Sequence, residues 1–342
     1  LTQNSATSML ILSSANTYTG ATNVNAGVLK ITNATAISTS SAVNVASGAT
    51  LQIQANSPLT AQTLTISGNG TSYSTGALQS TNTASYLGNV ILAADSTISS
   101  DLATTTLTVG TVGSTTITGS GKNLTVTGAG NTTLSGSLNT VAGTLTKIGT
   151  GRLTLSGTNA FTGLTSIDRG TLSLNISTAL NGGGNITFGG GTLQYTTNNS
   201  VDYASRIINS TGPISIDTNG QSRTFSSGLA ASNSGGLTKI GSGTLTLSGT
   251  NLYTGVTAVN DGLLAVSATS ALPSTSSIFT AVTGALNQGG AYTGVQGWLD
   301  SGKLMSSSIG AIALTIPSPP PIGSMPRIRP RLPLRSPMIS PI

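Results

Sequence analysis

The residue types that could do acid–base or metal chemistry are scarce in this sequence. The chain has 342 residues, of which seven are acidic, and it contains no His and no Cys. Without Cys there is no thiolate nucleophile, no disulfide and no Cys-ligated zinc. Without His there is no Ser-His-Asp triad and no imidazole base. Catalysis or calcium binding would therefore need clustered carboxylates. The acids are Asp95, Asp101, Asp168, Asp202, Asp217, Asp261 and Asp300.

The acids show no pattern that indicates a site. Asp95 and Asp101 are close enough in sequence to share one face, although a solvated turn or loop is the simpler interpretation. The stretch GGGNITFGGG at 182–191 lacks the Asp of calcium-binding nonapeptides, and ITGSGKNL at 117–124 lacks the spacing and the hydroxyl residue of a phosphate loop. We expect no catalytic, cofactor-binding or metal-binding residue, no cofactor and no enzymatic activity.

The net charge of +6 does not indicate a basic surface. Arg327, Arg329, Arg331 and Arg335 lie together near the end of the chain, and residues 1–316 hold nine basic against seven acidic residues, a balance of +2. Nucleic-acid binding requires a basic face, so we expect no nucleic-acid partner. No apolar run approaches the 18 residues of a membrane-spanning helix.

Internal repeats are the strongest signal in the sequence. Residues 143–175 and 235–267 are related by an offset of 92 and are identical at 19 of 33 positions. A truncated third copy lies at 10–31. Chance similarity in a chain of biased composition rarely keeps an Asn, an aromatic residue and several Gly in register. The repeat-defining residues, which we expect to be structural, are Asn16, Tyr18, Gly20 and Gly27, then Asn159, Phe161, Gly163 and Gly170, then Asn251, Tyr253, Gly255 and Gly262.

The repeats predict an all-β fold. The chain holds 58 Thr, 49 Ser and 44 Gly, which favour strands and turns over helices. Apolar residues alternate with Thr or Ser in runs such as Leu153-Thr-Leu155, and Gly or Asn-Gly separates the runs. The spacing is too uneven for regular hairpins. We therefore predict a right-handed parallel β-helix, in which short strands stack rung on rung.

Two recurring side chains have alternative interpretations. The aromatic residue of the repeat most simply covers a turn and packs on the rung below, and a sugar- or protein-binding platform is the functional alternative. Lys147 and Lys239 recur at the same offset, and we expect them to be solvated or to cap a carbonyl rather than to contact a ligand.

The pattern weakens towards the end of the chain. We predict a β-helix over 1–267, terminal rungs or a cap over 268–316, and a disordered Pro/Arg-rich tail over 317–342. Nine of the twelve prolines lie after Ile316, and proline cannot complete a β-ladder. An SH3-type ligand and a basic anchor are two functional interpretations of the tail. A reading-frame shift that truncated a longer protein explains the abrupt change of composition better.

At the repeats the sequence resembles the autotransporter-associated β-strand repeat of type V secreted passenger domains from Gram-negative bacteria. The matching stretches are LTKIGTGRLTLSGTNAFTG at 145–163, LTKIGSGTLTLSGTNLYTG at 237–255 and LSSANTYTGATNVNAGVL at 12–29. The resemblance implies an extracellular or cell-surface location at the outer membrane. It also implies a C-terminal outer-membrane β-barrel in the full-length protein, which this chain does not contain.

We therefore expect a surface-displayed or secreted structural and adhesive passenger segment. Its partners would be surface glycans or proteins of host cells or of other bacteria. Two alternatives remain: a carbohydrate-active β-helix enzyme, either a polysaccharide lyase or a hydrolase, and a surface-binding solenoid that uses threonine ladders. The enzyme requires two carboxylates within about 5–10 Å on one face, and the solenoid requires a regular Thr-x-Thr array across several rungs.

Overall fold

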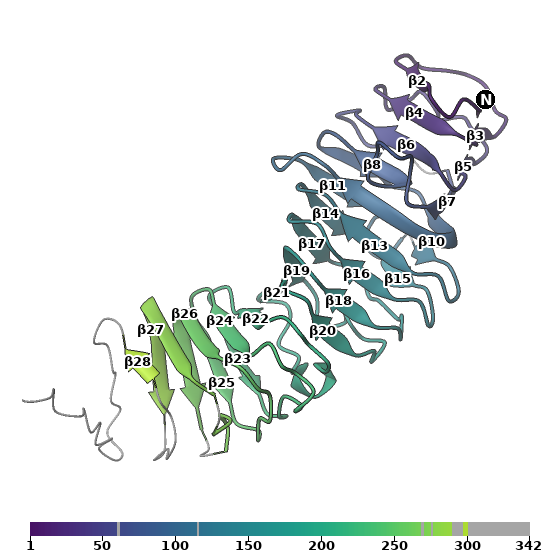
Figure 1. The fold of residues 1–342 in the computed structure, drawn as a ribbon. Coiled ribbons are helices and arrows are strands. Elements are labelled where there is room, and N and C mark those ends of the chain that lie inside the picture. The colour runs from purple at the N-terminus through teal and green to yellow at the C-terminus, as the bar shows by residue number, and fades with distance from the viewer. Residues whose placement is uncertain (60–61, 115, 268–269, 275, 289–296, 300–342) are drawn as a thin grey trace, which may run out of the picture. The chain divides into compact units, whose positions relative to one another are not determined.

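The computed structural model describes residues 1–299 except for 60–61, 115, 268–269, 275 and 289–296 (Figure 1). It is built from strands and one short 3-10 helix, η1 (Ala204–Arg206). The first sheet follows the order β1 (Thr2–Gln3), β3 (Thr22–Val24), β5 (Val43–Val45), β7 (Leu64–Gly68), β10 (Val90–Ser100), β13 (Leu124–Thr127), β16 (Leu145–Lys147), β18 (Thr165–Ile167) and β20 (Ile186–Phe188). Joined to this path are β2 (Met9–Leu12), β4 (Gly27–Ile31), β6 (Ala49–Ile53), β8 (Leu78–Ser80), β12 (Thr116–Thr118) and β15 (Ser137–Asn139).

The second sheet continues the same winding pattern. Its strands are β9 (Ala84–Tyr86), β11 (Thr106–Val109), β14 (Asn131–Leu134), β17 (Arg152–Leu155), β19 (Thr171–Leu174), β21 (Thr192–Tyr195), β22 (Ile214–Asp217), β23 (Ser222–Phe225), β24 (Leu237–Ile240), β25 (Thr244–Leu247), β26 (Thr257–Val266), β27 (Ile278–Gln288) and β28 (Gly297–Leu299). Every strand pair among the described residues is parallel. Parallel neighbours that lie one winding apart define a β-helix, so the predicted parallel β-helix is confirmed.

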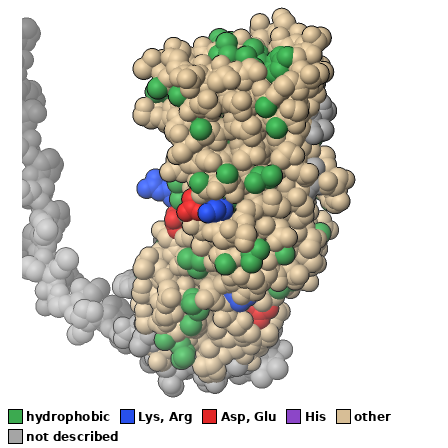
Figure 2. All heavy atoms as spheres, turned by 90° about the vertical axis from the view of Figure 1, so that its right-hand side faces the viewer, with side chains coloured by type: hydrophobic (Ala, Val, Ile, Leu, Met, Phe, Trp, Pro, Cys, Tyr) green, Lys and Arg blue, Asp and Glu red, His purple; other side chains and the backbone are tan. Residues whose placement is uncertain are grey.

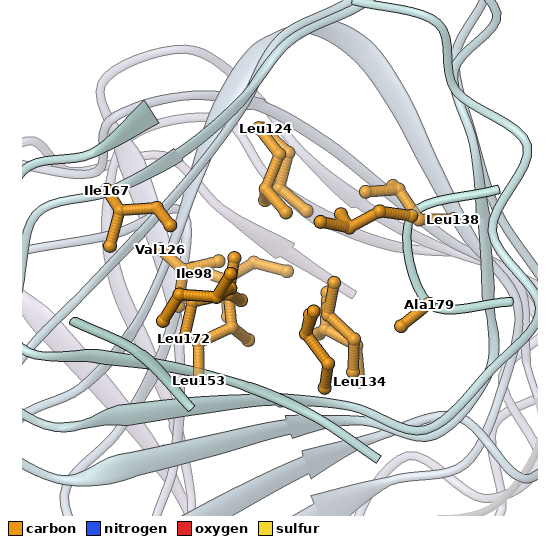
Figure 3. Packing of buried hydrophobic residues seen from close by; sticks show 14 of the residues in the cluster. Ile98, Leu124, Val126, Leu134, Leu138, Leu153, Ile167, Leu172 and Ala179 are labelled. Carbon is orange, nitrogen blue, oxygen red and sulfur yellow. The ribbon is translucent and has the colours of Figure 1, made fainter. Parts of the chain in front are cut away.

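The interior consists of stacked columns of apolar side chains. In register, Leu29 lies next to Leu51, Leu51 next to Leu78 and Leu78 next to Ile98. These four side chains are fully buried. Figure 3 looks into this interior, where Leu124, Leu134 and Leu138 point inward from three sides. The alternation of Leu, Val or Ile with Thr or Ser therefore places the apolar residues inside and the hydroxyl residues outside.

The first sheet ends at β20, and all later strands of the chain belong to the second sheet. Ile207 follows η1 and forms an isolated parallel bridge with Ile186 of β20, and β22 then pairs with β21. As a result the repeats at 143–175 and 235–267 begin in different sheets, although their sequences match. Strand β16 of the first copy belongs to the first sheet and strand β24 of the second copy to the second.

Glycine is required at one corner of every repeat. Gly27, Gly170 and Gly262 have φ angles of 67°, 65° and 66°, in the left-handed region that side chains disfavour. A Cβ atom on Gly170 would lie 2.5 Å from the carbonyl oxygen of Gly151 in the preceding rung. On Gly262 it would lie 2.5 Å from the carbonyl oxygen of Gly243. The repeat therefore keeps glycine here both for backbone conformation and for close rung stacking.

The structure describes only part of the C-terminal region for which the sequence makes predictions. Strands β27 and β28 extend the second sheet beyond residue 267. The predicted disordered tail at 317–342 lies outside the described residues.

Replacing Gly170 by Ala should destabilise the β-helix by at least about 2 kcal/mol, because the left-handed backbone and the short distance to the Gly151 oxygen both penalise a Cβ. Gly20 is the matched control, since a Cβ there would meet no atom within 4 Å. Gly20→Ala should change the free energy of unfolding by less than about 0.5 kcal/mol. Equal losses in chemical denaturation of the two variants would contradict the corner geometry.

Candidate functional site

The polar residues of the repeat lie at the corners of the β-helix, and Lys147 is the most unusual of them. It occupies an inward position between Val126 and Ile167 and is only 2% exposed. Its Nζ donates to the carbonyl of Gly149 in its own turn and, at 3.4 Å, to that of Arg169 in the next rung. The ammonium therefore connects two rungs from the inside.

Lys239 repeats this arrangement in the last copy. It lies between Ile216 and Val259 in register and is fully buried. Its Nζ donates to the carbonyls of Ile240 at 2.8 Å, Gly241 at 2.5 Å and Asp261 at 3.2 Å. Of the two sequence-based interpretations for these lysines, carbonyl capping is confirmed and solvation is wrong.

Just before the first repeat, Gln3 performs the same task, which sequence comparison did not reveal. Gln3 is in register with Val24, as Lys147 is with Ile167, and it is 7% exposed. Its Nε2 donates to the carbonyls of Ser8 at 2.8 Å and Val28 at 3.4 Å. The turn after Gln3 differs in length from the turn after Lys147, so alignment by residue spacing cannot match the two side chains.

Burial changes the protonation behaviour of both lysines. Loss of hydration lowers the pKa of Lys147 from 10.5 to about 8. The same effect lowers the pKa of Lys239 to about 8, although the nearby charges of Asp261 and Asp217 act in the opposite direction. A lysine of this kind can hold or release a proton near neutral pH. Here the backbone carbonyls around each ammonium give it a structural task.

The repeated Asn forms a bridge between successive rungs. Nδ2 of Asn16, Asn159 and Asn251 donates to the carbonyl of an Ala that lies 20 residues further on, at 2.9, 2.8 and 2.6 Å. Oδ1 of Asn159 and of Asn251 also accepts a backbone N–H from the preceding rung, at 2.7 Å in both cases. Asn159 and Asn251 are buried, so each links three rungs through atoms that water does not reach.

The repeated aromatic residue points inward. Tyr253 is fully buried and Phe161 is 3% exposed, whereas Tyr18 is partly exposed. The Tyr253 hydroxyl bonds to Thr257 Oγ1 at 2.6 Å, and Thr257 Oγ1 bonds to Ser276 Oγ at 2.7 Å. Buried rings of this kind pack between rungs and offer no exposed platform to a sugar.

The first repeat has the same hydroxyl chain and the middle repeat lacks it. Tyr18, Thr22 and Ser40 are connected by bonds of 2.8 and 2.9 Å. Phe161 has no hydroxyl, and the buried Oγ1 atom of the corresponding Thr165 has no hydrogen-bond partner among the described residues.

The recurring glycines at the other corner are not equivalent in their packing. A Cβ on Gly255 would lie 2.9 Å from the carbonyl oxygen of Ser234, and Gly255 has a φ of 94°. Gly163 stacks on the carbonyl of Gly143. Gly20 has open space around it. The position therefore demands glycine in the second and third copies only.

The structure places Asp95 and Asp101 in contact with opposite neighbouring rungs. Asp95 accepts from the backbone N–H and side chain of Asn123 at 2.9 and 2.8 Å, which lowers its pKa. Asp101 accepts from Thr75 and Gln79, both at 2.5 Å. Both carboxylates therefore serve contacts between rungs.

The other described acids also bind groups of their own chain. Asp202 accepts from the backbone N–H groups of Ser226 and Ser227 at 2.8 and 3.0 Å. Asp217 accepts from Gln194 Nε2 at 2.7 Å, and Asp168 accepts from the Ser166 hydroxyl at 2.6 Å. No group of three or more potential metal ligands occurs within the described part of the chain. Asp300 lies outside the described residues.

Two further buried side chains join rungs without belonging to the repeat motif. Asn233 Oδ1 accepts from the Ser210 N–H at 3.0 Å, and its Nδ2 donates to the Ile207 carbonyl at 2.8 Å. Asn199 Nδ2 donates to the Ile176 carbonyl at 2.7 Å. In a chain so rich in Asn, no local sequence signal distinguishes these residues from solvent-exposed ones.

Comparison with known protein families identifies the same three segments that contain these corner residues. The passenger-associated-transport-repeat matches the chain at residues 7–31, 145–174 and 237–266. These segments contain the Asn, aromatic and Gly positions described above, so the chain carries three autotransporter passenger repeats. No curated protein and no solved structure matches the chain. Among the described residues, no helix is long and apolar enough to cross a membrane.

The buried lysines and tyrosines predict a maximum of stability near pH 10. Between the folded pKa of about 8 and the unfolded value of 10.5 the unfolded lysines bind more protons, so the free energy of unfolding rises with pH. Burial raises the pKa values of Tyr86, Tyr195 and Tyr253, so unfolded tyrosines lose protons first above pH 10 and stability falls. Thermal unfolding followed by circular dichroism between pH 7 and 11 checks this.

The control for the pH profile is the double variant Lys147→Met and Lys239→Met. It removes both ammonium groups and keeps side chains of similar length, so the rise between pH 8 and 10 should flatten while the fall above pH 10 remains. A rise of unchanged size in the variant would assign the effect to other groups.

The hydroxyl chain predicts opposite effects at two equivalent positions. Tyr253→Phe should cost about 1 kcal/mol, because it removes the bond to Thr257. Phe161→Tyr should be neutral or stabilise by up to about 1 kcal/mol, because the added hydroxyl gives the buried Thr165 oxygen a partner. Chemical denaturation of both variants measures the difference. Destabilisation of similar size by both substitutions would show that the two rings are not equivalent.

Proposed function

We propose that this chain is a structural and adhesive segment of an autotransporter passenger, secreted or displayed at the surface of a Gram-negative bacterium, and that it acts without catalysis. The three passenger repeats and the parallel β-helix fit such a passenger. The observation that carries the adhesive part is the uncharged hydroxyl surface on the outside of the sheets.

That surface is ordered by the register of the strands. Thr108, Thr133 and Thr154 follow one another on β11, β14 and β17. All three side chains are partly exposed, and none of their hydroxyls forms a hydrogen bond within the described part of the chain. The strand spacing in a sheet is about 4.8 Å. A partner with repeated hydrogen-bonding groups, such as a surface glycan or an extended protein segment, would find a column of open hydroxyls at this interval.

Charge contributes little to this surface. Figure 2 shows one face of the molecule, on which Lys, Arg and Asp side chains occupy a few spots and uncharged side chains and backbone cover most of the area. Each of the six described Asp residues accepts a hydrogen bond from its own chain. This internal use of the carboxylates supports a non-catalytic role over a carbohydrate-active enzyme. It also favours contacts that depend weakly on salt.

The more specialised threonine-ladder function has less support. It requires two threonines on each strand, and Thr106-x-Thr108 on β11 satisfies this. The neighbouring strands offer Asn131-x-Thr133 and Arg152-x-Thr154 instead. Across β11, β14 and β17 the array is therefore regular in a single column, which suits a hydroxyl-rich adhesive face better than a flat two-column threonine ladder.

Removing the column of hydroxyls should weaken adhesion without unfolding the chain. Beads coated with the Thr108→Val, Thr133→Val and Thr154→Val variant should be retained on bacterial or epithelial cells about five-fold less than wild-type beads. Valine keeps the shape and strand preference of threonine. Flow cytometry at low and high salt measures retention, and wild-type binding should change little with salt.

The matched control carries Thr125→Val and Thr146→Val, which alter a hydroxyl column of the other sheet. Retention of wild-type beads no greater than that of albumin-coated beads would contradict the adhesive role. Release of reducing sugars or unsaturated products from surface polysaccharides would contradict the absence of catalysis.

A further inference from the structure

The backbone ladder of the β-helix narrows at the connecting segment, residues 196–213, which lies between β21 and β22. Elsewhere within 145–266, two strand pairs join each described rung to the next, for example β16 with β18 and β17 with β19. Among the described strands, the rung of β20 and β21 is joined to the rung of β22 and β23 by one pair, β21 with β22. The ladder between these two rungs is therefore narrower than the ladders on either side of it.

A side chain of the connecting segment compensates on the N-terminal side. The Arg206 guanidinium donates from Nε to the Gly184 carbonyl and from Nη1 to the Leu180 carbonyl, at 2.7 Å in both cases. Its central carbon lies 5.4 Å from the centre of the Tyr203 ring, which is buried. Arg206 therefore attaches the connecting segment to the turn that precedes β20.

Asp202 attaches the same segment to the rung that follows. One carboxylate oxygen accepts from the N–H groups of Ser226 and Ser227 at 2.8 and 3.0 Å and from the Ser226 hydroxyl at 2.7 Å. The other oxygen accepts from the Ala204 N–H at 2.9 Å. These bonds satisfy the backbone donors directly after β23, with which no preceding strand pairs among the described residues.

Arg223 reaches back from β23 to the connecting segment. Its register partner is Leu245, which is fully buried, so Arg223 occupies a position at which β25 directs an apolar side chain inward. Its Nη2 donates to the Thr196 carbonyl at 2.5 Å, and the guanidinium lies 5.5 Å from the centre of the Tyr195 ring. A charged side chain in the place of an apolar one thus links β23 to the end of β21.

The three charged side chains belong to a chain that has few of them. Only 6% of the residues are charged, yet Asp202, Arg206 and Arg223 lie close together in the sequence. Hydrogen bonds with an ionised partner are about twice as strong as neutral ones, so these side chains can replace part of a backbone ladder. In a solenoid each rung contacts only its neighbours, so the array divides most easily where one interface between rungs is small.

We propose that the connecting segment is a joint between two separately unfolding blocks of the β-helix. One block ends with β21, and the other begins with β22. Asp202, Arg206 and Arg223 hold the joint closed, and opening it exposes the edge of β21 and the Tyr195 ring, which is fully buried in the closed form. The proposal rests on contacts between interior rungs of the described chain and is independent of the adhesive role.

The test is native-state hydrogen exchange of the full chain, under conditions in which each amide reports its opening equilibrium. Ile167→Val removes a buried methyl group from the block before the joint, and Tyr253→Phe removes a bonded hydroxyl from the block after it. Each variant should accelerate exchange about five-fold in its own block. Ile167→Val should leave β24 and β25 unchanged, and Tyr253→Phe should leave β17 and β19 unchanged, because each block opens without the other.

Asp202→Asn tests the role of the charged side chains at the joint. It weakens the contact that either block must break in order to open, so it should accelerate exchange about ten-fold in both blocks. Asp168→Asn is the matched control. The Asp168 carboxylate binds Ser166 within the first block, so its replacement should leave the exchange of β24 and β25 unchanged.

Three results would overturn the proposal. Acceleration of the strands on both sides of the joint by Ile167→Val or by Tyr253→Phe would show a single cooperative unit. An effect of Asp202→Asn on one block alone would show that Asp202 does not hold the two blocks together. A gradual change of protection from β17 to β25, without a step between β21 and β22, would show that the rungs open one at a time.

Discussion

The rung-to-rung backbone ladder is the interaction on which the rest of this molecule depends. Most strands of the interior rungs are bonded to strands one winding before and after them, whereas β9, β15, β20 and β23 pair with a strand on one side. The ladder satisfies the main-chain donors and acceptors that a buried strand cannot leave unpaired. It also places similar side chains of successive rungs next to one another, so that Leu29, Leu51 and Leu78 form one continuous column. The order of side chains inside and outside the β-helix follows from this register.

The corners are where such a ladder is weakest, and the repeats act there. At a turn the backbone groups leave the sheet, and side chains must provide the missing partners. Lys147, Lys239 and Gln3 do so from inside, Asn159 and Asn251 do so between three rungs, and glycine lets successive turns approach. A buried ammonium is costly unless it is surrounded by acceptors. The carbonyls around the lysines offset part of that cost, and burial still lowers the pKa of both lysines.

The alternation of side chains along each strand also determines the outer surface. Because each inward residue alternates with an outward one, a long apolar core requires equally long outer columns. Thr and Ser occupy many of these outward positions. The few described carboxylates accept hydrogen bonds from their own chain, so the sides carry little charge and many hydroxyls.

The sequence by itself determined the fold class. Its alternation of period two, its glycine punctuation and its repeats predict a parallel β-helix, because these features are local and each repeat encodes its own strands. It also identified Asn, the aromatic residue and Gly as the defining positions. Only the tertiary structure decided that Lys147 and Lys239 are buried and that Gln3 replaces them. It also decided that Asn233 bridges rungs and that the two long repeats begin in different sheets. The physical reason is that these features depend on what lies one winding away, about 20 residues distant in sequence, and on turn lengths that local patterns do not encode.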